Sequence, residues 1–360
     1  MITMEILIIK LGAKGDIVRT LPIALALKKK YPDSKISWLT KEKNKEFIEN
    51  SPYVDSVFVL PYVRNAKGIS EHPKIPNQTQ EFFDVEDRKF DILYNFDIDE
   101  EAASLANKVP AEKKYGFFSQ EGFASAFNLG AEYYLNTLFD DETKKTNKKT
   151  YQEMMFMAAE LPYNQECHPI ILGEKDKKYS EEFAKRNNLK TENLIGIHIG
   201  SSPRWPSKFW TLERIEDFVL KASKNGHQLL LFAGPDDVEK QKKIASDLGQ
   251  KQVQVCFSDP KNTDLEFASL VSLCKFIVCG DSFALHVSLA LSKKTVALFF
   301  CTSPEEVEGY GHLKKLVSPM LYDFFPEKQD QYSEELVNSI SAEEVLKAIN
   351  SFKCQNSARL

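Results

Sequence analysis

Residues 194–210, LIGIHIGSSPRWPSKFW, begin like a buried strand and end like a binding loop. Apolar residues alternate through the first six positions, and the Gly-Ser-Ser turn at 200–202 then ends the strand. Arg204 and Lys208 follow, two cations set among tryptophan, proline and phenylalanine. Cations beside backbone amides suit a phosphate group, but the same residues also fit an ordinary surface loop. The pattern alone leaves both interpretations open.

The composition is that of a protein that can bury a large core. The chain has 360 residues, 42% of them apolar, and a formal net charge of −5. At roughly 150 residues per domain the length predicts two domains, and the negative charge argues against a nucleic-acid partner. The opening MITMEILIIKLG is too short an apolar run for a signal peptide, and no stretch is long enough to span a membrane.

The cysteine pattern predicts neither a metal site nor an oxidising compartment. The six cysteines, at positions 167, 256, 274, 279, 301 and 354, show no CxxC or zinc spacing. Three of them lie in apolar runs, where reduced thiols pack as small hydrophobic groups. We therefore expect a cytoplasmic protein.

Strands and helices alternate through both halves of the chain. In the first half the pattern predicts strands at 5–11, 35–39, 54–60, 90–96 and 114–118, with helices at 17–30, 41–49 and 100–108. In the second half it predicts strands at 194–199, 228–233, 253–257, 276–279 and 295–300, with helices at 180–187, 212–225, 237–248, 264–274 and 283–291. Such alternation is typical of parallel sheets covered by helices, so we expect an α/β fold with two Rossmann-like halves.

Turn residues and a capping motif set the expected domain boundaries. Turns at 162–168 separate two periodic regions, so we expect an N-terminal domain over 1–165 and a C-terminal domain over 166–335. A serine and a glutamate three positions apart, at 341 and 344, form a capping box that opens a helix within 336–360. We expect this last helix to pack back on the N-terminal domain.

The turn after the first strand is a second candidate site. Residues 10–16, KLGAKGD, place glycines at the carboxyl end of a strand, where open α/β sheets bind ligands. The sequence matches neither GxGxxG nor the P-loop motif. Asp16 is either the N-cap of the next helix or a carboxylate that acts as a general base. Residues 61–80, polar and interrupted by prolines, predict a loop on the ligand-bearing face.

A third candidate site lies at residues 278–283, VCGDSF, where a strand turns into a helix. The free amides of a helix start favour an anion, although Asp281 can also simply cap the helix. His286, one turn further along, is either a packing histidine or a donor to a phosphate oxygen.

Four motifs spread over nearly the whole chain carry a family resemblance. They are ILIIKLGAKGDIVRTLP, IGIHIGSSPRWPSKFW, LLLFAGPDD and GDSFALHVSLAL. Their order and spacing resemble those of glycosyltransferase family 9, the ADP-heptose:lipopolysaccharide heptosyltransferases. The resemblance implies a GT-B fold, in which two Rossmann-like domains face each other across a cleft, with the acceptor held by the first and ADP-heptose by the second.

The resemblance also implies a reaction and a setting. The reaction is an inverting, metal-independent transfer of heptose from ADP-heptose to a hydroxyl of a glycan, such as the lipopolysaccharide core, or of a protein. No cofactor is implied beyond the donor substrate. The implied location is the bacterial cytoplasm, with at most peripheral contact at the inner face of the inner membrane through a lipid-linked acceptor.

Residue roles follow from the same resemblance. Asp16 resembles the family's general base, which takes the proton from the acceptor hydroxyl, and Lys208 resembles the lysine that offsets charge on the departing ADP. The implied donor-binding positions are Ser201, Ser202, Arg204, Asp237, Asp281, Ser282 and His286. The implied acceptor-side positions are Lys14 and Arg19.

The sequence departs from the family pattern at two places. Phe283 replaces the usual glycine of the DSGxxH motif, which brings a bulky ring near the phosphates. Residues 317–320 lack the paired cysteines of some relatives, so we expect no bound iron.

Two rival functions are considered. They are a non-catalytic or hydrolytic relative that binds a nucleotide sugar, and a nucleotide-dependent oxidoreductase on a doubly wound fold. The presence of both Asp16 and Lys208 argues against the first, and the missing GxGxxG argues against the second.

Overall fold

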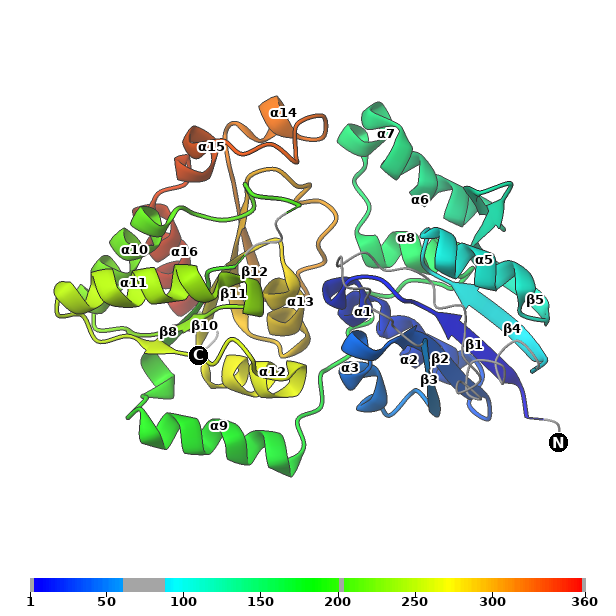
Figure 1. Ribbon diagram of the computed structural model, residues 1–360, viewed down its shortest axis with the longest axis horizontal. Coiled ribbons are helices and arrows are strands. Elements are labelled where there is room, and N and C mark those ends of the chain that lie inside the picture. Colours follow the sequence, from blue (N-terminus) through cyan, green and yellow to red (C-terminus); the bar gives the residue numbers. More distant parts are fainter. Residues whose placement is uncertain (1–2, 61–87, 201–203, 358–360) are drawn as a thin grey trace, which may run out of the picture. The chain divides into compact units, whose positions relative to one another are not determined.

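The computed structural model describes residues 3–60, 88–200 and 204–357, and the chain divides into two compact units, Met1–His168 and Pro169–Leu360 (Figure 1). The loop predicted at 61–80 and the candidate residues Ser201 and Ser202 lie outside the described residues. Within the described ranges, no helix combines the length and the apolar character needed to cross a membrane.

The first unit is built on a mostly parallel sheet. Its strands are β1 (Glu5–Ile9), β2 (Lys35–Lys41), β3 (Ser56–Leu60), β4 (Phe90–Asn95), β5 (Ala111–Gln120) and β6 (Phe123–Ala126). Among the described residues they form one six-stranded sheet in the order β3-β2-β1-β4-β5-β6, in which only the β5–β6 pair is antiparallel. The last four residues of β1 are 0% exposed although they point to alternate faces. Both faces of the sheet are therefore covered, as is typical of parallel sheets.

The helices of the first unit differ from the sequence prediction near its start. The helix expected over 17–30 is two helices, α1 (Lys14–Thr20) and α2 (Pro22–Lys30), because Pro22 has no amide proton to continue the first. The helix expected over 41–49 is a 3₁₀ turn, η1 (Glu42–Asn44), followed by α3 (Glu46–Glu49). The remaining helices are α5 (Glu100–Lys108), α6 (Leu129–Phe139), α7 (Asp141–Thr146) and α8 (Tyr151–Ala158).

The second unit is built on a fully parallel sheet. Its strands are β7 (Leu194–His198), β8 (Gln228–Phe232), β9 (Cys256–Phe257), β10 (Phe276–Gly280), β11 (Lys294–Phe299) and β12 (Leu313–Val317). Among the described residues they form one six-stranded sheet in the order β12-β11-β10-β7-β8-β9. Strand β12 was not predicted from the sequence.

Helices cover both faces of this second sheet. They are α9 (Glu174–Arg186), η2 (Thr191–Asn193), α10 (Leu212–Lys224), η3 (Pro235–Asp237), α11 (Val238–Gln250), α12 (Asp264–Leu273), α13 (Phe283–Ala290), α14 (Leu321–Phe324), α15 (Glu334–Asn338) and α16 (Ala342–Ser357). One apolar cluster joins α10, α11 and α16 to one face, and a second joins α9, α12 and α13 to the other. Both units are thus Rossmann-like α/β layers.

The last helix, α16, packs on the second unit, and the expectation that it packs back on the N-terminal domain stays a prediction. Its Val345 and Ile349 are fully buried in the same apolar cluster as Ile215 of α10. Figure 1 shows α16 next to α10. The predicted capping box is present, since Glu344 N donates to Ser341 Oγ at 3.3 Å and Ser341 N donates to Glu344 Oε2 at 2.7 Å. An apolar helix stripe shows that a helix is packed, but not on which surface.

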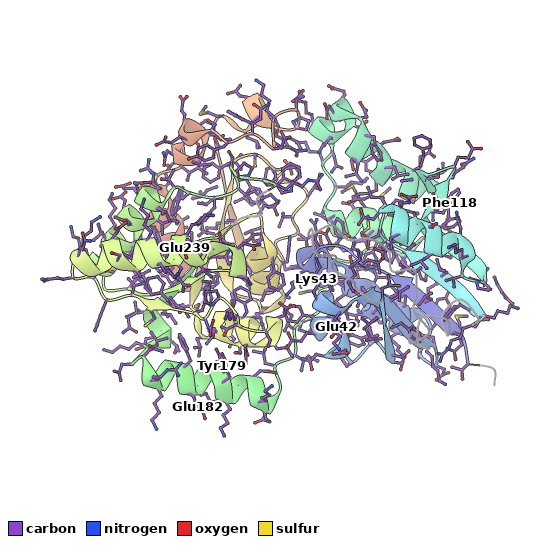
Figure 2. The ribbon with its side chains drawn as sticks, in the orientation of Figure 1. Glu42, Lys43, Phe118, Tyr179, Glu182 and Glu239 are labelled. Atoms are coloured by element: carbon purple, nitrogen blue, oxygen red, sulfur yellow. The ribbon has the colours of Figure 1, made fainter. Side chains whose placement is uncertain are left out.

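Helix α9 begins at Glu174, earlier than the predicted start at 180. Tyr179 in this helix donates to Asn262 Oδ1 at 2.7 Å and ties α9 to the loop before α12. Figure 2 shows Glu182 on the same helix pointing away from the unit. Helix α9 is mostly polar and has few apolar residues, so its sequence shows little helical periodicity.

Candidate functional site

Several predicted site residues of the second unit follow the two strands between which the strand order of its sheet reverses. Strand β7 pairs with β8 on one side and with β10 on the other. The segments that follow β7 and β10 leave the carboxyl edge of the sheet at this switch point, which is where open α/β sheets bind ligands. Arg204 and Lys208 follow β7, and Asp281, Ser282 and His286 follow β10.

Lys208 and Asp281 hold the two segments together. Lys208 Nζ lies 2.9 Å from the backbone oxygen of Asp281 and 3.3 Å from its Oδ2. The two side chains are 16% and 17% exposed. The backbones approach so closely that a Cβ at Gly280 would lie 2.2 Å from the backbone oxygen of Lys208. A glycine at the end of β10 is therefore what allows the lysine to reach this junction.

Helix α13 starts beside this cation without a side-chain cap. Ser282 is its N-cap residue, but the serine side chain accepts no hydrogen bond from the first turn. Among the described residues, the buried Oγ of Ser282 has no hydrogen-bond partner. Asp281 precedes the N-cap, so the alternative that it caps the helix is wrong. The uncapped amides and the helix dipole leave a partial positive charge that favours an anion.

His286 and Phe283 project from the same helix. His286 is 8% exposed, and its Nε2 lies 3.9 Å from Asp281 Oδ1, so it faces the junction as well as the core. Phe283 stacks on Phe267 of α12, with ring centroids 5.5 Å apart and planes 27° apart. The ring that replaces the family's glycine therefore packs against a neighbouring helix.

Asp237 lies close to the end of β7. It is 6% exposed, it precedes α11, and its Oδ1 accepts from Lys240 Nζ at 2.9 Å. A Cβ at Gly200 would lie 2.1 Å from Asp237 Oδ2. Burial lowers the pKa of His198 to about 4, although the Asp237 carboxylate and the Gly200 backbone raise it. His198 is therefore neutral at neutral pH beside a buried carboxylate.

The aromatic residues of the loop after β7 anchor it to the domain. Trp210 Nε1 donates to the backbone oxygen of Ile340 at 2.9 Å, and Ser207 Oγ donates to that of Gln331 at 2.9 Å. The guanidinium of Arg204 lies 4.9 Å from the ring centre of Trp205 and is exposed. The loop is thus fixed to the domain, and the Lys208 side chain turns toward the switch point.

In the first unit, Asp16 lies in the first turn of α1 and is not its cap. The N-cap is Ala13, and Lys14 is the first helical residue. Arg19 donates to Asp16 Oδ1 from Nη2 at 2.7 Å and from Nε at 3.1 Å, and its guanidinium lies 3.8 Å from the ring centre of Tyr151. Asp16 is 31% exposed and Arg19 is 16% exposed. The structure brings Asp16 and Arg19 together and leaves part of the carboxylate accessible.

A buried ion pair near this turn was not predicted from the sequence. Lys10 follows β1, Asp97 follows β4, and their side chains are 4% and 8% exposed. Lys10 Nζ lies 2.6 Å from Asp97 Oδ1. The sequence signal that could have revealed the pair is a lysine directly after an apolar strand. A lysine at such a position is rarely buried unless it is paired with an acid.

The comparisons with known proteins agree with this architecture. Residues 84–337 match the family model of glycosyltransferase family 9 (heptosyltransferase), so the chain belongs to this family. It is 22% identical to lipopolysaccharide heptosyltransferase 2 of Escherichia coli, over 99% of this chain and 100% of that protein. The family and the enzyme class predicted from the sequence, a glycosyltransferase, are confirmed.

Solved structures show the same fold. A family 9 glycosyl transferase from Veillonella parvula superposes with a TM-score of 0.76, at 22% identity over 98% of both chains. The ADP-heptose lps heptosyltransferase II of E. coli superposes with a TM-score of 0.70, at 19% identity over 98% of this chain and 100% of that one. The α/β class, with the two Rossmann-like domains of the GT-B fold, is confirmed. The turn that carries Asp16 lies outside the matched residues 84–337.

Proposed function

We propose that this protein transfers heptose from ADP-heptose to a hydroxyl of a glycan acceptor of the lipopolysaccharide-core type, with inversion at the anomeric carbon. The observation that carries the proposal is the fixed ammonium of Lys208 beside the uncapped start of α13, at the switch point of a family 9 glycosyltransferase. Two E. coli relatives, lipopolysaccharide heptosyltransferase 2 and the ADP-heptose lps heptosyltransferase II, support the choice of donor.

The second unit binds the donor in this proposal. The diphosphate lies at the amides of α13, and Lys208 offsets the negative charge that grows on ADP as it leaves. Arg204, Ser201, Ser202, Ser282 and His286 supply further donors to phosphate and sugar oxygens. Asp237 accepts hydrogen bonds from the ribose hydroxyls. A buried carboxylate suits that role because its remaining lone pairs gain from a hydroxyl donor.

The first unit supplies the base and the acceptor contacts in this proposal. Asp16 takes the proton of the acceptor hydroxyl as the oxygen attacks the anomeric carbon. The bond from that carbon to the diphosphate breaks, and its electron pair leaves with ADP, so a single displacement inverts the centre. Lys14 and Arg19 lie on the acceptor side. Arg19 already holds Asp16, which fixes the direction of the carboxylate.

The proposal also covers the metal and the location. Lys208 and the helix amides carry the leaving-group charge, so the transfer needs no metal ion and no cofactor. The protein acts at the inner face of the bacterial inner membrane where its acceptor is lipid-linked, and it contacts the membrane only through that acceptor.

A donor panel tests the function. Wild-type protein is incubated with ADP-heptose, ADP-glucose, UDP-glucose, GDP-mannose or NAD, with and without a heptose-free core acceptor, and the products are followed by mass spectrometry. The expected result is ADP release and addition of one heptose to the glycan from ADP-heptose alone, at the same rate in EDTA. Transfer from a UDP or GDP donor would overturn the donor assignment. Hydrolysis without transfer would favour the hydrolytic alternative, and transfer to a protein would replace the glycan.

A further inference from the structure

We propose that the buried Lys10–Asp97 ion pair positions Asp16 for proton transfer, by fixing the turn that leads into α1 and by placing a permanent positive charge behind the base. Neither residue matches a role implied by the family resemblance. The inference rests on the proposed function, because it assumes that Asp16 is the base.

The pair is hydrogen-bonded to the backbone at the carboxyl ends of two central strands. Lys10 Nζ donates to Asp97 Oδ1 at 2.6 Å and to the backbone oxygen of Phe96 at 2.9 Å. Asn95 Nδ2 donates to the backbone oxygen of Asp97 at 2.9 Å, which holds the chain after β4 in place. A buried charge is tolerated only with such partners, so each member of the pair requires the other.

The same carboxylate holds the turn that leads to Asp16. Asp97 Oδ2 accepts from the backbone amides of Leu11 and Gly12, the latter at 2.8 Å. Asn44 Nδ2 donates to the backbone oxygens of Leu11 and Gly12 at 2.8 and 2.7 Å. Both the donors and the acceptors of this turn are therefore bound. The chain then enters α1 within a few residues, so the position of Asp16 follows the position of the turn.

Gly12 shows how closely the turn fits the pair. A Cβ at this position would lie 2.8 Å from Asp97 Oδ1 and 3.2 Å from Lys10 Nζ. An alanine must therefore displace the carboxylate, although it removes neither charge. Gly12 is partly exposed, which makes it a milder probe of the pair than a substitution in the core.

Asp16 interacts electrostatically with Lys10 and with the two buried phenols of Tyr134 and Tyr151. Burial lowers the pKa of Lys10, but Asp97, Tyr151 and Asp16 raise it, and the net pKa is well above its ordinary value. The ammonium therefore stays charged throughout the working pH range. Burial is the main cause that raises the pKa of Tyr151 and of Tyr134, so both phenols stay neutral. In the part of the chain that the structure describes, Lys10 and Arg19 are two cations that act on this carboxylate.

If the ion pair positions the base, its removal should change the kinetics and the pH profile. If it only supports the sheet, its removal should change stability alone. Lys10→Met removes the charge and retains an unbranched side chain. The expected result is a fall in kcat of about tenfold or more with an unchanged KM for ADP-heptose, which is bound by the second unit. The acid limb of the kcat/KM profile moves to higher pH by about one unit or more, because an opposite charge nearby favours an ionised base.

A surface pair of the same chemistry provides the matched control. Lys28 Nζ lies 2.7 Å from Asp55 Oδ2, which also accepts from the backbone amide of Ile36 at 2.7 Å. This pair lies away from the α1 turn. Lys28→Met is expected to leave kcat and the pH profile at wild-type values.

Two further variants separate positioning from folding. The double variant Lys10→Met/Asp97→Asn has no unpaired buried charge, so its melting temperature recovers even if a single variant is unstable. Its kcat and acid limb are expected to stay altered. Gly12→Ala is expected to lower kcat without changing the KM for the donor.

Three results would overturn the inference. The first is a wild-type pH profile and a wild-type kcat in Lys10→Met. The second is that the double variant recovers the wild-type kcat and pH profile when it recovers the wild-type melting temperature. The third is a wild-type kcat in Gly12→Ala. Failure of the proposed function is separate, because it appears as an active Asp16→Asn variant. An inactive Asp16→Asn with a normal Lys10→Met overturns only the positioning role.

Discussion

Asp16 shows how one turn of helix decides between two roles for a residue. If the helix began at Ile17, Asp16 would be its N-cap, and the carboxylate would accept hydrogen bonds from the backbone amides of the first turn. The helix begins at Lys14 instead, so Asp16 lies inside the first turn and its side chain projects to Arg19. A carboxylate in the first turn of a helix is also stabilised by the positive end of the helix dipole.

Substitution of Asp16 by asparagine keeps the shape and removes the base. We predict a fall in turnover of about 100-fold or more with little change in ADP affinity, because the proposed donor site lies in the other unit. Steady-state kinetics and calorimetry measure the two quantities. Asp33→Asn, at an exposed acid after α2, serves as the control. Near-normal turnover would remove the catalytic role from Asp16.

His198 makes the stability of the second unit depend on pH. Its pKa is about 4 in the folded protein, mainly because of burial, and about 6.5 when unfolded. At pH 7 the ring is neutral in both states and contributes nothing. Below pH 6.5 the unfolded chain binds a proton that the folded chain does not, so stability falls with pH until about pH 4. The difference corresponds to a loss of about 3 kcal/mol at most.

Replacement of His198 by glutamine should remove this part of the pH dependence. We predict that the urea midpoint of the wild type falls from pH 7 to pH 4.5 more than that of His198→Gln, as followed by circular dichroism. His312→Gln, before β12, controls for the loss of a histidine as such. Parallel curves for wild type and His198→Gln would show that His198 does not carry the effect.

Among the elements, the proposed donor site depends on how closely the loop after β7 approaches the end of β10. The contact lies between the backbone of Lys208 and Gly280, where any side chain would collide with a carbonyl oxygen. Backbone cannot yield as a flexible side chain does, so a methyl group there must push the two segments apart. The ammonium of Lys208 would then leave Asp281 and the start of α13.

Gly280→Ala tests this packing. We predict that ADP affinity falls by about tenfold or more, with a loss of about 1–3 kcal/mol in the free energy of unfolding. Gly249→Ala in α11 is the matched control, because a Cβ there meets nothing within 4 Å, and a helical alanine is favoured over glycine. Unchanged ADP binding in Gly280→Ala would place the diphosphate elsewhere.

Most strands and the three candidate loops could be predicted from the sequence. Strand β12 and the boundary between α1 and α2 could not. Strands buried on both faces leave continuous apolar runs, as in β1 and β10, and these are easily recognised. Strand β12, with two lysines and partial exposure, leaves no such run. The break between α1 and α2 is signalled only by Pro22, which is also a common first residue of a helix.

At the scale of the whole molecule, the two units place their candidate residues by the same rule. In each sheet the strand order reverses beside the first strand of the unit, and the polar residues follow the strands on both sides of that reversal. Alternation of strands and helices predicts this edge. It does not predict which residues meet there, because Lys10 and Asp97 are 87 positions apart and come together only through the pairing of β1 with β4.

We propose that the second unit alone binds the nucleotide, through Lys208 and the start of α13. Calorimetric titration of ADP into wild type, Lys208→Ala and Asp16→Asn tests it most directly. A hydrogen bond from a charged group is worth about 1.5–3 kcal/mol, so Lys208→Ala should weaken ADP binding by about tenfold to 100-fold. Asp16→Asn should bind ADP as the wild type does. ADP binding by Lys208→Ala as tight as that of the wild type would contradict the account.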